Sequence, residues 1–272
     1  MPKTVFITGA STGIGYETAK VFQQQGWMVV ATMRSPEKVP DLAALPNVTC
    51  LRLDVTDAAS IETAVTTALQ QFQTIDVLVN NAGYGLIGAF EACSPVEIQR
   101  QFATNVFGLM EVTRAFLPHF RERQAGVIVN VASIGGHIAI PLYSPYHATK
   151  WAVEGFSESL QYELEPFNIR VKVIEPGPIK TDFYSRSMTF AEKPDLTAYD
   201  EFIARVKPAL EQAGESGSPP TVTAQIIYKA ACDRSKRLRY PAGGNAGAIL
   251  LLRKLLPDAL LHPLLRSMMI RN

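Results

Sequence analysis

Tyr146 and Lys150 are the two residues of this sequence whose types and spacing best suit acid–base chemistry. Because they lie four positions apart, both side chains leave the same face if the segment is helical. A phenol with a pKa near ~10 is a poor proton donor at neutral pH, and a fixed ammonium group beside it lowers that pKa towards the working range. The same spacing also occurs on ordinary helix surfaces, so its interpretation depends on the surrounding elements.

The residues that follow this pair predict the helix that would position it. Apolar side chains continue at helical spacing at Ala152, Phe156, Leu160 and Leu164. Neither glycine nor proline lies between the tyrosine and the lysine. We therefore expect both side chains on one face of a regular helix.

Strands and helices alternate along the first two thirds of the chain. Short apolar runs typical of buried strands occur at 5–7, 27–32, 48–53, 75–79, 127–131 and 171–174. Segments of helical periodicity lie between them, and one begins at the capping-box residues Ser94 and Glu97, with Pro95 at its first position, and extends towards Phe116. This alternation predicts an α/β fold, a doubly wound parallel sheet of the Rossmann type with helices on both faces.

The chain is predicted to be a single domain, 1–272, whose last third differs in character. Aromatic and polar residues mix over 181–220, which ends in a Gly/Ser/Pro-rich connector, so we expect two short helices that act as a substrate lid. Thr221 is expected to cap a further helix, 226–231, and 238–240 to be the last strand.

The Leu-rich segment 246–272 is predicted to be a C-terminal extension. Charged residues and prolines interrupt it, which excludes a helix that spans a membrane. Its leucines can form a wall of the lid, pack in the core or a subunit interface, or make a peripheral contact with a membrane surface. The sequence leaves these alternatives open.

Composition limits the class of protein. The 272 residues are 47% hydrophobic and 19% charged, which suits one soluble domain with a substantial core. The 26 basic and 25 acidic residues give a net charge of +1, so no nucleic-acid partner is expected. Cys50, Cys93 and Cys232 have neither disulfide nor metal-ligand spacing and are expected to be reduced, buried thiols. The same cysteine spacing predicts no metal site. The opening residues leave no room for a secretory leader, so we expect a cytoplasmic protein.

The glycine-rich segment 8–15 lies between the first predicted strand and the first predicted helix. Glycines allow a tight turn and a close backbone approach, and a pyrophosphate binds favourably at a helix N-terminus. The spacing Gly-x-x-x-Gly-x-Gly differs from the Gly-x-Gly-x-x-Gly of the commonest dinucleotide fingerprint. Its place between a strand and a helix nevertheless favours nucleotide binding over a purely structural turn.

Over roughly residues 3 to 185 the sequence resembles the short-chain dehydrogenase/reductase family, and within it the hydroxysteroid and retinol dehydrogenases and the acyl-dihydroxyacetone-phosphate reductases. The resemblance implies four catalytic residues, which are Asn105, Ser133, Tyr146 and Lys150. It also implies a set of cofactor contacts, which are Gly9, Ser11, Thr12, Gly13, Ile14, Gly15, Asp54, Val55, Asn81, Ala82, Gly83, Tyr146, Lys150, Pro176, Gly177, Ile179 and Thr181.

The resemblance further implies a role for each of the four catalytic residues. Tyr146 exchanges a proton with the substrate, while Lys150 lowers the pKa of the tyrosine and binds the nicotinamide ribose. Ser133 hydrogen-bonds to the substrate carbonyl, and Asn105 holds a water in a proton relay. Judged from the residues alone, Ser133 could instead be a turn residue and Asn105 a surface position, although asparagine is unfavourable in mid-helix and calls for a reason.

The end of the second predicted strand bears on the choice of cofactor. Dinucleotide folds that use NAD usually carry an acidic residue there, on the ribose hydroxyls, and segment 29–35 contains none. Arg34 stands in the next position, where a guanidinium can bind a phosphate in a bidentate manner; its alternative role is that of a solvated loop arginine. We therefore expect NADP(H) to be preferred. Some use of NAD(H) is also expected, because Thr12 in the glycine turn is not basic.

Residues close to the catalytic segment are expected to form a hydrophobic substrate pocket, although His137 and Tyr143 can also be satisfied polar residues. The predicted pocket residues are His137, Leu142, Tyr143, Phe183, Tyr184 and Met188. The sequence thus predicts an NADP(H)-dependent oxidoreductase that interconverts a carbonyl and an alcohol of a steroid-, retinoid- or lipid-like substrate, or of an aliphatic ketone or aldehyde. The family resemblance implies a homodimer or homotetramer. A catalytically silent NADP(H)-binding sensor or scaffold, and a module that binds a membrane surface or a partner, are the alternatives.

Overall fold

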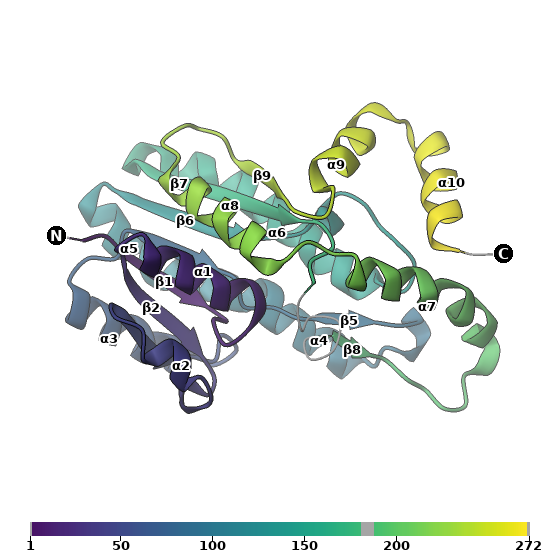
Figure 1. Ribbon diagram of the computed structural model, residues 1–272, viewed down its shortest axis with the longest axis horizontal. Helices are drawn as coiled ribbons and strands as arrows, with labels where there is room; N and C mark the ends of the chain where they lie inside the picture. Colours follow the sequence, from purple (N-terminus) through teal and green to yellow (C-terminus); the bar gives the residue numbers. More distant parts are fainter. Residues whose placement is uncertain (1, 181–187, 271–272) are drawn as a thin grey trace.

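A parallel sheet lies at the centre of the part that the computed structural model describes, residues 2–180 and 188–270. Its strands are β1 (Thr4–Thr8), β2 (Met28–Met33), β3 (Val48–Arg52), β4 (Val77–Asn80), β6 (Gly126–Val131), β7 (Ile169–Pro176) and β9 (Arg239–Ala242). The order across the sheet is β3-β2-β1-β4-β6-β7-β9 (Figure 1). Because this order reverses between β1 and β4, their carboxyl ends border the crevice in which doubly wound folds bind ligands.

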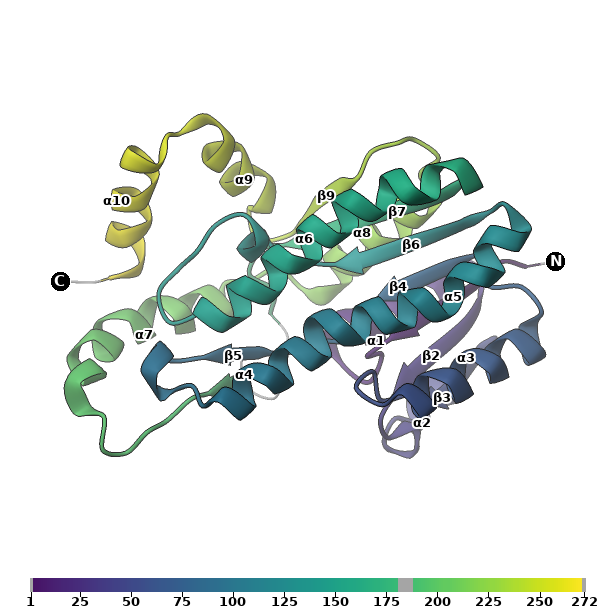
Figure 2. The same cartoon turned by 180° about the vertical axis from the view of Figure 1, so that it is seen from behind.

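Helices cover both faces of this sheet, which is why its central strands are apolar on both sides. The covering helices are α1 (Gly13–Gln24), α3 (Ala58–Phe72), α5 (Leu109–Arg123), α6 (Ser144–Leu164) and α8 (Pro220–Cys232). α1 and α8 lie on the face turned towards the viewer in Figure 1, and α3, α5 and α6 lie on the face seen in Figure 2. The predicted Rossmann-type architecture is confirmed.

Two layers of buried side chains join these helices to the sheet. Phe22, Trp27 and Ile227 belong to the layer under α1 and α8, and Phe6 and Phe116 belong to the opposite layer. The rings of Phe6 and Phe116 meet edge to face, with their centroids 4.9 Å apart. Burying a side chain of this size contributes about 1.5–3 kcal/mol. Together these layers fix the strand ends that carry the candidate site.

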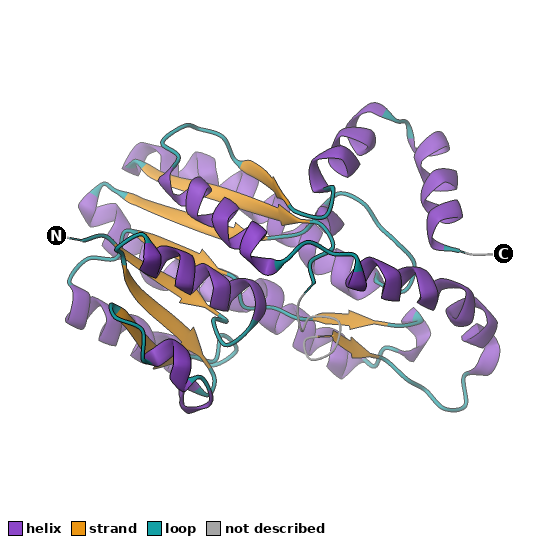
Figure 3. Ribbon diagram, in the orientation of Figure 1, coloured by secondary structure: helices purple, strands orange, loops and turns teal. Residues whose placement is uncertain are grey.

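Smaller elements surround the carboxyl edge of the sheet. They are α2 (Pro40–Ala43), β5 (Gly85–Ile87), α4 (Pro95–Phe102), β8 (Met188–Phe190), α7 (Asp200–Glu215), α9 (Ala246–Leu255) and α10 (Asp258–Met269). β5 and β8 pair in parallel as a separate small sheet, and α9 and α10 project from the body of the domain (Figure 3). Among the described residues, none of the helices has the length and apolar character needed to cross a bilayer.

The helix predicted to begin at Ser94 is present, with both hydrogen bonds of the capping box. It does not end near Phe116. From α4 it continues through a π-helical turn, Ala103–Gly108, into α5, which ends at Arg123. The extra residue per turn in a π-helix has no signature in apolar spacing, and such turns are frequent at functional sites.

The C-terminal third departs from its predicted pattern in several places. The described part of 181–220 contains β8 and one long helix, α7, instead of two short helices. Thr221 is not a helix cap, because α8 already begins at Pro220, whose fixed φ and missing N–H suit a first helical position. Cys232 is exposed instead of buried, since it is the last residue of α8.

Candidate active site

The carboxyl ends of the strands open into a cavity of about 860 Å³. Its lining combines the glycine turn after β1 with the ends of β2, β3, β4, β6 and β7, the first turn of α6, and residues of α9 and α10. One part of the wall is therefore built of backbone and polar groups, and another of leucine and methionine side chains. The cavity lies where the reversal of strand order predicts a ligand crevice.

Two glycines of the turn after β1 adopt positive φ angles. Gly9 has φ +67°, and a Cβ atom there would lie 2.8 Å from Ala82 Cα; Gly13 has φ +57°. Thr12 precedes α1 and makes no side-chain capping hydrogen bond to that helix. Backbone N–H groups at the start of α1 therefore face the cavity edge, as an anion-binding helix N-terminus requires. Gly15, predicted as a cofactor contact, does not line the cavity: a Cβ atom would lie 2.3 Å from Gly9 O, so this glycine serves packing within the protein.

Thr8 ties the two strands that border the crevice, although sequence analysis did not select it. Its Oγ1 accepts hydrogen bonds from the backbone N–H groups of Asn81 and Ala82, both at 3.0 Å. In return Asn81 Nδ2 donates to the carbonyls of Thr8 and Gly9, also at 3.0 Å. Asn81 thus acts by holding the glycine turn, and Ala82 and Gly83 line the cavity beside it. A buried threonine at the end of a strand was the available signal.

Arg34 and Asp54 lie on the cavity wall at the ends of β2 and β3. Arg34 is exposed, so its guanidinium can reach a ligand in the cavity. Burial by itself would raise the pKa of Asp54, but hydrogen bonds from the backbone and hydroxyl of Thr56, at 2.9 and 2.7 Å, and the charge of Arg34 hold that pKa below its usual value. Val55 lines the cavity next to this carboxylate. An ionised acid and a cation therefore flank the outer end of the glycine turn.

Tyr146 and Lys150 occupy one face of α6, as their spacing predicts, and both line the cavity. Lys150 Nζ donates to Val131 O at 3.0 Å and lies 5.7 Å from the centroid of the Tyr146 ring. Burial lowers the pKa of Lys150 to about 8, and the carboxylate of Glu154 works against that shift. The ammonium group is held beside the phenol ring by a backbone carbonyl, so its position does not depend on a ligand.

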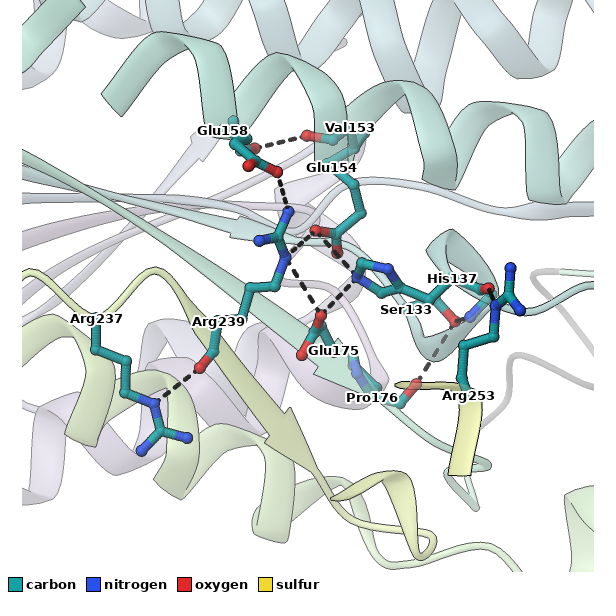
Figure 4. A network of polar contacts seen from close by, with 12 residues as sticks. Ser133, His137, Val153, Glu154, Glu158, Glu175, Pro176, Arg237, Arg239 and Arg253 are labelled. Carbon is teal, nitrogen blue, oxygen red and sulfur yellow. Dashed lines mark hydrogen bonds and ion pairs between the residues drawn. The ribbon is translucent and has the colours of Figure 1, made fainter. Parts of the chain in front are cut away.

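Ser133 belongs to the loop that joins β6 to α6, and His147 lies in the first turn of α6. Ser133 Oγ accepts from Gly135 N at 3.0 Å and donates to Pro176 O at 3.5 Å (Figure 4). His147 Nε2 accepts from Ile140 N at 3.0 Å, which requires a neutral ring with its proton on Nδ1, 2.9 Å from Gly135 O. Burial lowers the pKa of His147, in agreement with this neutral form. His147, which sequence analysis did not select, thus fastens the Ser133 loop to the catalytic helix.

Asn105 lies in the π-helical turn and is 2% exposed. Its side chain makes a two-way contact with Tyr84, donating to Tyr84 O at 2.8 Å and accepting from Tyr84 N at 3.0 Å. Nδ2 also lies 3.2 Å from the hydroxyl of Thr149 on α6. Asn105 therefore connects the loop after β4 to the catalytic helix from outside the cavity lining, and its predicted role in a proton relay stays a prediction.

The predicted substrate pocket is only partly correct. Tyr143 lines the cavity, but Leu142 and Met188 pack behind it in an apolar cluster with Ile87, because Leu142 has φ +67° and turns into that cluster. His137 is not a pocket wall; its ring points to the carboxylates of Glu154 and Glu175 (Figure 4). Thr181, Phe183 and Tyr184 lie outside the described residues. Pro176, Gly177 and Ile179 line the cavity as predicted.

The apolar part of the wall comes largely from α10. Its lining residues recur at helical spacing and are Leu261, Leu264, Leu265, Met268 and Met269. Ile249 and Leu252 of α9 adjoin them. The periodicity of this segment was visible in the sequence. Only the fold determines that this face looks into the cavity.

The chain matches the family model described as short chain dehydrogenase over residues 3–191. An uncharacterized oxidoreductase of Bacillus subtilis is 40% identical, with 94% of each chain covered. A 3-ketodihydrosphingosine reductase of Bacteroides thetaiotaomicron is 34% identical, with 97% of each chain covered. Both matches cover a larger share of this chain than the family model does.

Solved structures agree with this fold over almost the whole chain. A short-chain dehydrogenase from Streptomyces avermitilis has a TM-score of 0.85 at 35% identity, covering 97% of this chain and 94% of that one. A protein of Burkholderia phymatum in complex with NAD has a TM-score of 0.80 at 26% identity, covering 96% and 95%. ElxO with NADP bound has a TM-score of 0.74 at 25% identity, covering 91% and 100%. Similar structures therefore hold nicotinamide cofactors of both kinds.

Proposed function

Because the chain belongs to the short-chain dehydrogenase/reductase family, we propose that it is an NADP(H)-dependent oxidoreductase that interconverts a carbonyl and an alcohol of a hydrophobic substrate. The observation that carries this proposal is the composition of one cavity. Tyr146, Lys150 and Ser133 line it together with the leucine and methionine side chains of α10. A reactive group held at the polar residues would thus have its apolar part next to α10.

The chain supplies groups for binding, orientation and proton transfer. The glycine turn, the start of α1, Arg34 and Asp54 would hold the dinucleotide, whose nicotinamide supplies the hydride when it is bound. In the reductive direction Tyr146 would donate its phenolic proton to the carbonyl oxygen, and Ser133 would orient that oxygen by a hydrogen bond. The Lys150 ammonium favours the phenolate that remains. These roles rest on the family resemblance and on the geometry around α6.

The preference for NADP(H) rests on Arg34. No acidic residue stands at the end of β2, where an NAD enzyme of this fold usually places one. The exposed guanidinium beside the cavity offers a charge-assisted site for a phosphate.

The hydrophobic substrate is tested with aliphatic aldehydes and ketones of increasing length. Each methylene buried against the leucines of α10 should add about 0.8 kcal/mol at most, so kcat/KM should rise several-fold per carbon until the cavity is full. A flat or falling series would contradict the substrate class and favour a small polar carbonyl. NADPH binding without turnover on any member of the series would favour the alternative of a cofactor-binding sensor.

A peripheral contact with a membrane is a further proposal for the C-terminal helices. Leu251, Leu255, Leu260 and Met268 are all more than half exposed on α9 and α10, and Lys254 adjoins them. Sedimentation with vesicles of phosphatidylcholine and phosphatidylglycerol tests the contact: wild type should pellet with the vesicles, and Leu251→Ser/Leu255→Ser should remain in the supernatant. If both stay in the supernatant, the contact is refuted.

We also propose a homodimer or homotetramer in the cytoplasm. Trp151 and Tyr162 on α6, and Phe107 in the π-helical turn, are large apolar residues with exposed side chains on the outer face of the domain. Such residues on one pair of helices suit contact with a second copy. Light scattering coupled to size-exclusion chromatography measures the mass directly, and a monomer would contradict this assignment.

A further inference from the structure

Four charged side chains lie together near Ser133 (Figure 4). They are His137 of the loop after β6, Glu154 of α6, Glu175 of β7 and Arg239 of β9, and are called the charge cluster below. Every member comes from a different element, so the cluster ties together four parts of the carboxyl edge.

The cluster is compact and has balanced charges. His137 Nε2 lies 2.8 Å from Glu175 Oε1 and 3.4 Å from Glu154 Oε2. Arg239 Nε lies 2.9 Å from Glu154 Oε2 and 3.7 Å from Glu175 Oε1. The side chains of Glu154 and Glu175 are only 5% and 2% exposed, so their charges need these partners. The Arg239 guanidinium and the imidazole of His137 thus supply positive charge to both carboxylates.

The charge cluster touches the catalytic residues through direct neighbours. Glu154 follows Lys150 by one helical turn on the same face of α6. Glu175 precedes Pro176, whose carbonyl oxygen accepts the hydrogen bond of Ser133. The loop that contains Ser133 lies against α6 with little space, because a Cβ atom on Gly136 would be 2.7 Å from Glu154 Cγ and 3.0 Å from the carbonyl oxygen of Lys150.

The cluster also reaches the apolar wall of the cavity. Arg253 of α9 donates from Nε to the backbone carbonyl of His137 at 3.1 Å and forms an ion pair with Asp258 at the start of α10. A change in the position of His137 would therefore displace both the Ser133 loop and the C-terminal helices.

We propose that the charge cluster positions the Ser133 loop on α6 and fixes the proton affinity of Lys150. His137 and Glu154 would then be positioning residues of the reaction, acting through Lys150 and Ser133 without touching substrate. The proposal rests on the roles proposed above for Tyr146 and Lys150.

The direction of each effect follows from the charges that face Lys150. Glu154, one turn away on the same helix, is the anion that acts on Lys150. His137 and Arg239 lie against the carboxylates of Glu154 and Glu175 and partly neutralise them. Glu154 raises the pKa of Lys150 against the lowering effect of burial. The ion pairs of His137 with Glu154 and Glu175 raise the pKa of His137 to about 9. The imidazole is therefore still charged at the pH where Lys150 titrates, near its own pKa of about 8. Removing the anion should favour the neutral lysine, and removing the imidazolium should favour the charged one.

The experiment measures the Kd of NADPH by fluorescence titration as a function of pH, with kcat/KM followed in parallel. Glu154→Gln should move the alkaline midpoint of binding down by about one pH unit, the lower end of the range for a neighbouring charge. At a pH above both midpoints this shift corresponds to roughly tenfold weaker binding. His137→Gln should move the midpoint up, and His137→Lys, which restores the cation, should return it to the wild-type value. Lys150→Met should abolish the midpoint and so assign it to Lys150.

Glu158→Gln is the matched control. Glu158 pairs with the same arginine, with Arg239 Nη2 2.6 Å from Glu158 Oε2, but its side chain is 50% exposed and it lies one turn farther from Lys150. Its midpoint should equal that of wild type. If the Glu154 variant does not fold, as judged by circular dichroism, the two variants of the partly exposed His137 decide the matter.

Opposite shifts for the glutamate and histidine variants support the proposal. Unmoved midpoints, or shifts in the same direction, overturn it, even if both variants lose stability or turnover, because a merely structural role lowers those without moving a titration. Opposite shifts in cofactor binding without turnover of any carbonyl would overturn the proposed function and leave the role of the charge cluster intact.

Discussion

The phenolic oxygen of Tyr146 is the single atom on which the proposed turnover depends most. Tyr146→Phe removes that oxygen and keeps the ring that packs edge to face against Tyr143, with centroids 5.8 Å apart. We expect turnover to fall by more than a hundredfold while the Kd of NADPH changes little, because only the proton transfer is lost. Stopped assays and fluorescence titration measure the two quantities. A variant that retains over a tenth of wild-type kcat would limit the contribution of the hydroxyl to less than ~1.4 kcal/mol and contradict its assignment.

Arg34 is predicted to discriminate between the two cofactors. Arg34→Ala should weaken NADPH binding by roughly ten- to a hundredfold and leave NADH binding almost unchanged, since a charge-assisted hydrogen bond contributes ~1.5–3 kcal/mol and only NADPH offers the phosphate. Lys38→Ala, an exposed cation in the same loop that does not line the cavity, is the control. Equal losses for both cofactors in the Arg34 variant would mean that the arginine only shapes the loop.

At this scale the sequence identifies residues that belong to motifs and misses those that act through backbone contacts. The spacing of Tyr146 and Lys150 predicted that they share a helix face, as they do on α6, whereas Ser133 was selected from the family resemblance. Thr8 and His147 were not, because their importance lies in which N–H and carbonyl groups they meet across the fold. His137 was misplaced for a related reason: its two carboxylate partners lie 17 and 38 positions farther along the chain.

Among the elements, α10 decides the predicted preference for long substrates. Leu265 is half-buried on the cavity wall. Leu265→Ala removes contacts worth about two to three buried methylene groups, and relaxation of the surrounding side chains partly offsets this loss. We therefore expect kcat/KM for the longest carbonyls to fall by about tenfold. Short carbonyls should be unaffected because they do not reach α10. Leu255→Ala, on the exposed side of α9 at 68% exposure, is the matched control. A uniform loss across all chain lengths would indicate a general effect on folding instead of a substrate wall.

The elements themselves were predictable to different degrees. β1, β2 and β4 are largely apolar runs because both faces of the sheet are covered, and each was predicted from the sequence. β5 and β8 are only three residues long and pair across about a hundred positions, so neither gives a local pattern. The segment that forms α9 and α10 was predicted only as a Leu-rich extension, and the sequence did not indicate what its leucines contact. One face lines the cavity together with Thr189, Leu210 and Ala213 of segment 181–220, and the lid function of that segment stays a prediction.

For the whole molecule, the buried Lys150 and the partly exposed His137 oppose each other in the dependence of stability on pH. Ion pairing raises the pKa of His137 to about 9 from 6.5, so its stabilising contribution is fully present below pH 6.5 and is lost as the pH rises through 9. Burial lowers the pKa of Lys150 to about 8 from 10.5. Between these pH values the folded protein has lost the proton of Lys150 while the unfolded chain still holds it, so the free energy of unfolding rises with pH. The wild-type curve alone would therefore hide both contributions.

Near pH 6 the difference between wild type and His137→Gln reports on the histidine, because Lys150, with a pKa of about 8, is protonated in both proteins there. We expect wild type to be more stable by about 1–2 kcal/mol near pH 6, a value that allows for the partial exposure of the imidazole, and the difference to shrink towards zero near pH 10. Urea unfolding at a series of pH values gives the free energies directly. A difference that stays constant over this range would mean that the ring stabilises the fold by packing, as in its contact with Trp151 at 6.3 Å between centroids, and not by its charge. A difference that grows with pH would have the wrong sign for an ion pair and would place the histidine in its neutral form throughout.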